Sequence, residues 1–379
     1  MPKKKLMTII GTRPEIIRLS EVIKKCDQYF NQILVHTGQN YDYNLNQVFF
    51  YDLGLREPDH YLNSVGENLG DTIGNIIAQS YRVMVEEKPD ALLILGDTNS
   101  CLCAISAKRL HIPIFHMEAG NRCFDECLPE ETNRRIVDHI SDVNMCYSEH
   151  ARRYLNHEGT ARERTFVVGS PMAEVLDRNF NQIKESKILE ELNLHEKEYI
   201  LLSAHREENI DTEQNFFSLM NAVNAMAEKY DMPILYSCHP RSKKYIESRN
   251  FIFDKRVMQH EPLGFHDYNN LQMNAYAVVS DSGTLPEESS FYLTKGIVLP
   301  AVCIRTSTER PEALEKGDFI LAGISEQDLL MAVDMAVEMG ECGDIGLRVP
   351  DYEDRNVSVK VVKIIQSYIA LVNKFVWRK

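Results

Sequence analysis

The chain alternates short β-rich runs with longer segments of helical spacing, and this alternation constrains its fold more than any other feature. The first half contains the strand-like runs "KLMTII", "NQILVHTG", "DALLIL", "IPIFHM" and "DVNMCYS", separated by segments whose apolar residues recur at helical intervals. Strand–helix alternation of this kind is typical of a parallel, doubly wound sheet. We therefore predict an α/β protein.

The same alternation starts again in the second half, with "YILLSAHREEN", "MPILYSCHP", "NAYAVVSDSG" and "GIVLPAVCIR". A length of 379 residues also favours two domains, because an ordinary domain has about 100–200 residues. We predict two Rossmann-like doubly wound domains, residues 1–170 and 171–356, that join near Gly169 to Asn179 and face each other across a cleft. The long amphipathic helix at 357–379 is expected to pack back on the first domain.

The composition argues against several classes of protein. The formal net charge is −14, whereas a protein that binds nucleic acid needs a basic face. The apolar run after the N-terminal lysines has only about five residues, too few for a signal peptide or a membrane span. Nine cysteines without a secretory signal indicate free thiols in the cytoplasm. Cys123 and Cys127 have no second pair at metal-like spacing, so we expect no metal site.

A turn between a strand and a helix stands where a dinucleotide-binding protein would have its glycine-rich loop. The segment "GTRPEIIR", Gly11 to Arg18, contains Pro14, a residue that favours the first helical turn. A helix start offers unpaired N–H groups and a partial positive charge to a phosphate, and Arg13 and Arg18 can add bidentate contacts. The alternative is a tight strand–helix turn with solvated arginines.

Two further turns have the same character. One is "VVSDSGTLPEES", Val278 to Ser289, in which Ser282, Gly283 and Thr284 can present N–H and hydroxyl donors at one point. A plain helix N-cap would explain only one of these three residues. "RTSTERPEA", Arg305 to Ala313, again places arginines and hydroxyls between a strand and a helix. Three such turns in two domains predict a bound diphosphate and nucleotide.

Acidic and imidazole side chains follow several of the predicted strands. They are Asp97 in "ILGDTNS", Glu118 in "HMEAG", Glu130 and Glu131 in "LPEETNR", and His205, Arg206, Glu207 and Glu208 in "SAHREEN". A doubly wound fold keeps its chemistry at such strand ends. Singly, Asp97 also suits a helix cap and Glu130 a partner of the helix dipole. Together they predict two sets of acid–base groups around a phosphate pocket.

Seven motifs in order, "GTRPEIIR", "GDTNS", "EAGNR", "PEETNR", "HREEN", "SDSGTLPEES" and "TERPEA", cover nearly the whole chain. In this order they resemble the non-hydrolysing UDP-N-acetylhexosamine 2-epimerases, which have a glycosyltransferase-B-like fold. The resemblance implies the catalytic residues Asp97, Glu118, Glu130 and His205. With the turns described above, it assigns substrate and UDP binding to Arg13, Arg18, Arg206, Ser282, Gly283, Thr284, Glu288 and Arg310. Arg18 departs from the lysine of better-known members, which keeps the charge but changes the hydrogen-bond geometry.

The chemistry that the resemblance implies requires such residues. No carbonyl acidifies the C2 hydrogen of an N-acetylhexosamine, so an anti-type elimination of UDP to a 2-acetamidoglycal, followed by re-addition, gives the epimer. Arginines and helix N-termini stabilise the departing diphosphate, and a carboxylate or histidine moves the proton. No metal, nicotinamide or other cofactor is needed. A glycosyltransferase of the same fold and a non-catalytic UDP-sugar sensor are alternatives, and the carboxylates argue against both.

Two segments bear on the identity of the sugar. Members acting on UDP-N-acetylglucosamine usually have a longer segment between "EAG" and "PEE", whereas this chain has the compact "EAGNRCFDECLPEETNRR". With "HTGQNYDYNLNQVFF", it resembles the branch that converts UDP-2-acetamido-2,6-dideoxy-L-talose to UDP-N-acetyl-L-fucosamine for capsule or O-antigen synthesis. The alternative is a UDP-N-acetylglucosamine 2-epimerase making UDP-N-acetylmannosamine. The sequence at Gln39 to Asp42 predicts no activation by UDP-N-acetylglucosamine, and the resemblance also implies a homodimer.

Overall fold

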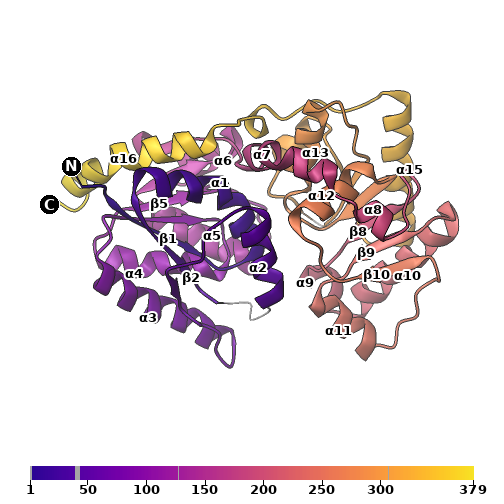
Figure 1. The fold of residues 1–379 in the computed structure, drawn as a ribbon, viewed down its shortest axis with the longest axis horizontal. Coiled ribbons are helices and arrows are strands. Elements are labelled where there is room, and N and C mark those ends of the chain that lie inside the picture. Colours follow the sequence, from indigo (N-terminus) through magenta and orange to yellow (C-terminus); the bar gives the residue numbers. More distant parts are fainter. Residues whose placement is uncertain (1, 39–42, 127, 306) are drawn as a thin grey trace. The chain divides into compact units, whose positions relative to one another are not determined.

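The computed structural model describes residues 2–38, 43–126, 128–305 and 307–379 (Figure 1). The chain forms two compact units, one made of Met1–Asp177 with Asp354–Lys379 and the other of Arg178–Glu353. The sequence predicts a boundary at residues 170 and 171, and the boundary between the units lies a few residues later, inside a helix. The segment Gln39 to Asp42, on which the prediction about activation depends, lies outside the described residues.

The first unit contains a parallel sheet of seven strands in the order β3-β2-β1-β4-β5-β6-β7. Its strands are β1 (Lys5–Ile10), β2 (Asn31–His36), β3 (His60–Tyr61), β4 (Ala91–Leu95), β5 (Ile114–Met117), β6 (Val143–Cys146) and β7 (Thr165–Val167). Its helices are α1 (Arg13–Tyr29), α2 (Tyr43–Asp52), α3 (Leu69–Glu87), α4 (Ala104–Arg109), α5 (Pro129–Ile140), α6 (Glu149–His157) and α16 (Val357–Phe375), and α7 (Met172–Glu185) crosses into the second unit. The strand order reverses between β1 and β4, which is where ligands of such sheets bind.

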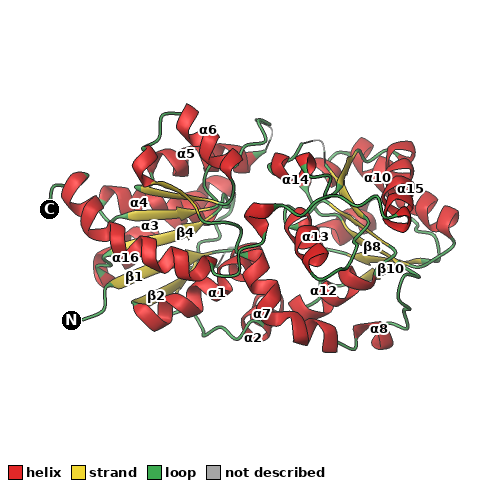
Figure 2. Ribbon diagram, turned by 90° about the horizontal axis from the view of Figure 1, so that it is seen from above, coloured by secondary structure: helices red, strands yellow, loops and turns green. Residues whose placement is uncertain are grey.

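The inner strands of this sheet are buried because helices cover both of its faces (Figure 2), whereas the edge strands β3 and β7 are partly exposed. Strand β4 has the sequence "ALLIL" and all five of its residues are buried. A continuous apolar run of this kind is expected of a parallel strand that packs on both faces. Helix α16 packs against α1, and its buried residues Val361, Ile365, Ile369 and Val372 recur at helical intervals.

The second unit contains a parallel sheet of six strands in the order β10-β9-β8-β11-β12-β13. Its strands are β8 (Ile200–Ser203), β9 (Ile234–Ser237), β10 (Val257–His260), β11 (Ala277–Ser280), β12 (Ala301–Ile304) and β13 (Ile320–Ala322). Its helices are α8 (Ile188–Glu191), α9 (Glu207–Ile210), α10 (Glu213–Tyr230), α11 (Pro240–Ser248), α12 (Phe265–Asn274), α13 (Leu285–Thr294), α14 (Pro311–Glu315) and α15 (Glu326–Cys342). Here the order reverses between β8 and β11.

These two parallel sheets confirm the predicted α/β, doubly wound fold class.

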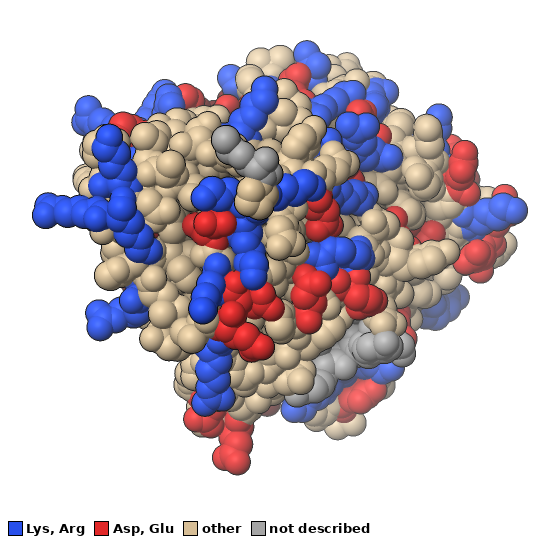
Figure 3. All heavy atoms as spheres, turned by 60° about the vertical axis from the view of Figure 1, so that its left-hand side comes forward, with Lys and Arg blue, Asp and Glu red and all other residues tan. Residues whose placement is uncertain are grey.

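On the face drawn in Figure 3, Lys and Arg side chains are interspersed with Asp and Glu side chains. Within the described ranges, none of the helices combines the length and the apolar character that a membrane span requires.

Candidate functional site

Arg18 and Glu118 form an ion pair at the edge of the sheet where β1, β4 and β5 have their carboxyl ends. Arg18, in the second turn of α1, places Nη1 at 2.7 Å from each carboxylate oxygen of Glu118, and both side chains are buried. Asn121 adds a hydrogen bond to Glu118 Oε1 at 3.3 Å. Glu118 has a φ of 64°, a left-handed conformation that is uncommon for a residue with a side chain and concentrates at functional sites.

Asp97 follows β4 and is held by two residues of α5. Arg134 Nε lies 2.7 Å from Asp97 Oδ2, and Asn133 donates to the backbone carbonyl of Asp97 at 2.8 Å. The nearly buried guanidinium of Arg134 therefore fixes the position of the Asp97 carboxylate. The sequence analysis did not assign Arg134 or Asn133 to the site, although both belong to the motif "PEETNR" that follows Glu118.

The two neighbouring glutamates of α5 have different surroundings. Glu131 is fully buried, accepts the backbone N–H of Cys123 at 3.2 Å, and lies 2.9 Å from Arg134 Nη1. Burial raises the pKa of Glu131, but hydrogen bonds from Cys123 and the charge of Arg134 outweigh it, so the pKa is lowered overall. Glu130 is partly exposed in the first turn of the helix. Glu131 therefore holds the loop that precedes α5, and Glu130 is the more accessible carboxyl group.

The turn between β1 and α1 is closed by the side chain of Glu15. Glu15 accepts the backbone N–H groups of Gly11 and Thr12 at 3.0 and 2.7 Å, which is the capping-box arrangement. Glu15 also accepts hydrogen bonds from the hydroxyls of Thr98 and Ser100, so it joins this turn to the turn that carries Asp97. Burial raises the pKa of Glu15 to about 7. The predicted binding of a phosphate by the start of α1, Arg13 and Arg18 stays a prediction.

In the second unit, Asp281 fixes the turn that carries His205. Asp281 Oδ2 accepts the backbone N–H groups of His205 and Arg206 at 2.8 Å each, and Asp281 Oδ1 lies 3.1 Å from His205 Nδ1. Burial raises the pKa of Asp281, but His205 and Arg206 lower it further, to well below the usual range. Asp281 ends the strand-like run "VVSDSG", yet the sequence analysis did not identify it as the partner of His205.

The turn before α13 groups the donors that the sequence predicts. The hydroxyls of Ser282 and Thr284 lie 2.9 Å apart, and α13 begins one residue after Thr284. A Cβ atom on Gly283 would lie 2.9 Å from Glu309 Oε1, so a larger residue here would require the Glu309 side chain to shift. Arg206 Nη2 lies 3.8 Å from the same Glu309 oxygen, which places Arg206 beside this turn.

Glu288 and Arg310 are both engaged inside the second unit. Gln272 donates to Glu288 Oε2 at 2.6 Å, and Arg310 Nη2 lies 3.3 Å from Glu287 Oε1. Arg310 is almost fully buried. The roles of these two residues in nucleotide binding stay predictions.

The candidate catalytic residues are divided between the two units. Asp97, Glu118 and Glu130 belong to the first and His205 to the second. Among the residues that the structure describes, no group of three or more His, Cys, Asp or Glu side chains is placed to hold a metal ion. Each unit thus supplies acid–base groups and arginines, in keeping with chemistry on a phosphorylated substrate.

The chain is similar to known epimerases over nearly its whole length. The family model described as UDP-N-acetylglucosamine 2-epimerase matches residues 24–366. A structure of UDP-N-acetylglucosamine 2-epimerase from Rickettsia bellii is 46% identical, covers 100% of both chains and has a TM-score of 0.90. The Methanocaldococcus jannaschii UDP-GlcNAc 2-epimerase, in complex with UDP-GlcNAc and UDP, is 31% identical over 96% of this chain and 99% of its own, with a TM-score of 0.89. UDP-2,3-diacetamido-2,3-dideoxy-D-glucuronate 2-epimerase from Pseudomonas aeruginosa is 33% identical over 84% of this chain and 88% of its own. The chain therefore belongs to the UDP-N-acetylglucosamine 2-epimerase family and is a UDP-sugar 2-epimerase.

Proposed function

We propose that this epimerase inverts C2 of a UDP-activated N-acetylhexosamine by anti elimination of UDP and re-addition to the 2-acetamidoglycal. The observation that carries the proposal is that two carboxylates at adjacent strand ends, Asp97 and Glu118, are each paired with an arginine at 2.7 Å. A carboxylate held by an arginine at a strand end is placed to take a proton from a substrate.

The elimination and its reversal balance in protons and electrons. A protein base takes the C2 proton, the C–H electron pair forms the C1–C2 double bond, and the C1–O electron pair leaves with UDP. In the second step a β-phosphate oxygen of UDP attacks C1, and a protein acid protonates the opposite face of C2. We assign these transfers to Asp97, Glu118, Glu130 and His205. Asp281 holds Nδ1 of His205, which leaves Nε2 for the substrate, as in other histidines oriented by a carboxylate.

We assign the binding of UDP to donors in both units. In the second unit they are Ser282, Gly283 and Thr284 at the start of α13, with Arg206 beside them. A helix start with adjacent hydroxyls and an arginine stabilises the charge of a leaving diphosphate. The remaining assigned contacts are those of Arg13, Arg18, Glu288 and Arg310.

Incubation with UDP-N-acetyl sugars in heavy water tests the reaction. An epimerase places deuterium at C2, because the proton that returns comes from a protein group in exchange with solvent. A glycosyltransferase and a UDP-sugar sensor leave C2 unlabelled. Absence of C2 deuterium with every UDP-N-acetylhexosamine supplied overturns the proposed mechanism.

For the sugar, we propose UDP-2-acetamido-2,6-dideoxy-L-talose, converted to UDP-N-acetyl-L-fucosamine for capsule or O-antigen synthesis. The support is the compact segment from Glu118 to Glu130, because a 6-deoxy L-sugar changes the wall of the hexose site and leaves the UDP motifs unchanged. Conversion of UDP-N-acetylglucosamine fits the comparisons equally well. In a side-by-side turnover assay, faster epimerisation of UDP-N-acetylglucosamine overturns the proposed sugar and leaves the epimerase standing.

We further propose a homodimer, located in the cytoplasm, that uses the outer face of α3. Tyr81 and Val85 of this helix are 43% and 47% exposed, and their spacing of four residues places them side by side on one face. Exposed apolar side chains that lie together favour an interaction surface. Sedimentation at micromolar concentration is expected to give a dimer that Tyr81→Arg dissociates. A wild-type protein that sediments only as a monomer overturns this proposal.

A further inference from the structure

A buried histidine lies beside the turn that carries Asp97. His116, in strand β5, places Nε2 at 2.9 Å from the backbone carbonyl oxygen of Gly96, the residue before Asp97. The other ring nitrogen, Nδ1, lies 3.0 Å from Oδ1 of Asp138 in helix α5. Both side chains are 1% exposed. His116 therefore links α5 to the backbone of the Asp97 turn.

Asp138 also holds the turn that follows Glu118. Its two oxygens each lie 3.2 Å from the backbone N of Gly120, which donates to them, and Gly120 is two residues beyond Glu118. Arg122 Nη1 donates to Asp138 Oδ2 at 2.7 Å, and Arg122 itself is fixed by Glu158 through Nε and Nη2 at 2.9 and 2.6 Å. Asp138 thus has firm partners on the side of the Glu118 turn.

The partners of His116 determine its protonation. A carbonyl oxygen only accepts hydrogen bonds, so Nε2 must carry a proton to interact with Gly96. Asp138 accepts from Gly120 and Arg122, which is the behaviour of an ionised carboxylate. Burial raises the pKa of Asp138, but His116 and Arg122 outweigh this effect and lower it. Nδ1 lies beside this carboxylate, so the ring bridges Asp138 and the carbonyl oxygen of Gly96.

We propose that His116 and Asp138 are positioning residues that fix the Asp97 turn relative to the Glu118 turn. The inference rests on the proposed function, in which both carboxylates act on one sugar. Glu118 has a φ angle of 64°, a strained conformation that persists only where its surroundings hold it. A Cβ atom on Gly96 would lie 3.0 Å from Glu118 Oε2, so the two turns are in close approach. A displacement of about 1 Å at reacting groups can cost on the order of 100-fold in rate.

The test compares two isosteric substitutions at buried, ion-paired aspartates. Asp138→Asn removes the charge that holds His116 at the carboxyl end of β5. Asp142→Asn is the matched control, because Asp142 is also buried but accepts the N–H of Ile114 at 3.0 Å, at the amino end of the same strand, and pairs with Lys108 at 2.7 Å. We expect Asp138→Asn to lower kcat about 10–100-fold with KM and UDP affinity nearly unchanged. Asp142→Asn is expected to lower the melting temperature and leave kcat near that of the wild type.

Nitrogen-15 NMR of labelled histidine tests the contact with Gly96 directly. Nε2 of His116 is expected to carry a proton in the wild type, with its signal assigned by its loss in folded His116→Gln. A wild-type ring whose Nε2 carries no proton overturns the proposal.

The kinetic outcomes separate this inference from the proposed function. If the wild type incorporates no deuterium at C2, the proposed function fails. If the wild type exchanges and folded Asp138→Asn keeps the wild-type kcat, or Asp142→Asn loses kcat to the same extent, the positioning role is wrong and the function stands. If Asp138→Asn fails to fold, His116→Gln takes its place, because glutamine keeps one donor for the Gly96 carbonyl but loses the contact with Asp138. This variant is also expected to lower kcat and to leave KM nearly unchanged.

Discussion

Arg18 donates through the single atom Nη1 to both carboxylate oxygens of Glu118, at 2.7 Å to each, and the two side chains are buried together. This pair joins the first helix to the end of β5 across 100 residues of sequence. In a buried pair, removing one partner leaves an uncompensated charge, which is far more costly than the net contribution of the intact pair. The pair therefore affects both the stability of the first unit and the ionisation of a candidate catalytic group.

Two substitutions at Arg18 separate charge from geometry. Arg18→Lys keeps the positive charge, so we expect a folded enzyme whose turnover falls by less than about 10-fold. Arg18→Met leaves Glu118 unpaired, and we expect a loss of about 3–5 kcal/mol in the free energy of unfolding together with a large loss of turnover. Chemical denaturation and steady-state kinetics measure the two effects. Equal stability of Arg18→Met and the wild type would contradict the role of the pair.

Substitution of the candidate acid–base groups should stop the chemistry without unfolding the protein. We expect Asp97→Asn, Glu118→Gln and His205→Ala each to reduce turnover by about 10²–10⁴-fold, the usual contribution of general acid–base groups. Deuterium incorporation at C2 and circular dichroism measure activity and folding. Asp90→Asn is a suitable control, because Asp90 accepts the N–H of Lys5 at 2.8 Å, at the amino ends of β1 and β4. Normal exchange in all three variants refutes the catalytic assignment.

Gly283→Ala should weaken UDP binding by crowding the turn before α13. The added Cβ atom would lie 2.9 Å from Glu309 Oε1, and Glu309 is itself paired with Arg305 at 2.7 Å. A steric conflict of about 1–3 kcal/mol corresponds to a loss of affinity of roughly 10-fold or more. Calorimetric titration with UDP measures it. Gly74→Ala in α3, where a Cβ atom would meet nothing within 4 Å, should leave UDP affinity unchanged.

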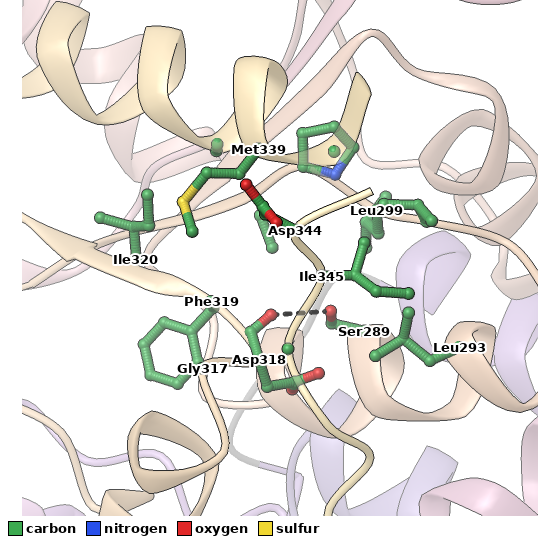
Figure 4. Close-up of a pocket in the computed structure, with 16 residues that line it drawn as sticks. Ser289, Leu293, Leu299, Gly317, Asp318, Phe319, Ile320, Met339, Asp344 and Ile345 are labelled. Carbon is green, nitrogen blue, oxygen red and sulfur yellow. Dashed lines mark hydrogen bonds between the residues drawn. The ribbon is translucent and has the colours of Figure 1, made fainter. Parts of the chain in front are cut away.

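Asp318 should make the protein less stable as the pH rises. Its carboxylate oxygens are buried and receive no hydrogen bond within the described parts of the chain, although Ser289 donates to its backbone carbonyl (Figure 4). Burial raises the pKa of Asp318 well above the usual value of 3.8. The folded state therefore favours the protonated carboxyl group. Its contribution to the free energy of unfolding is fully present below pH 3.8 and is lost as the pH rises through the pKa of Asp318 in the folded state.

Asp318→Asn removes this titration. The free energy of unfolding of the variant should therefore exceed that of the wild type by an amount that grows from about pH 4 upward and reaches about 1–3 kcal/mol. Melting temperatures across this pH range measure the difference. Asp344→Asn, at an exposed residue lining the same cavity of about 70 Å³, is the control and should follow the wild type. Parallel curves for Asp318→Asn and the wild type would show that the carboxyl group of Asp318 is not protonated in the fold.

The sequence by itself determined the fold class and the edges of the sheets where polar groups gather. Runs such as "ALLIL" in β4 and "AVVS" in β11 are continuous and apolar because each strand is buried on both faces. The spacing of apolar residues along the sequence therefore indicates which side chains are buried. The positions of Asp97 and Glu118 after such runs predicted that they lie at one edge, since carboxyl ends of neighbouring parallel strands meet there.

Only the tertiary structure decided which side chains pair with these groups. Arg134 reaches Asp97 across 37 positions and Asp281 reaches the N–H of His205 across 76, separations about which local periodicity carries no information. At the β1–α1 turn, the sequence predicts a phosphate at the start of the helix, and only the structure shows that Glu15 accepts the N–H groups of Gly11 and Thr12. Such pairings depend on strand order and on how each helix packs on its sheet, because a charge–charge contact needs two side chains within about 4 Å of each other. The sequence predicted which strand ends carry the candidate acid–base groups, and packing decided which side chains contact them.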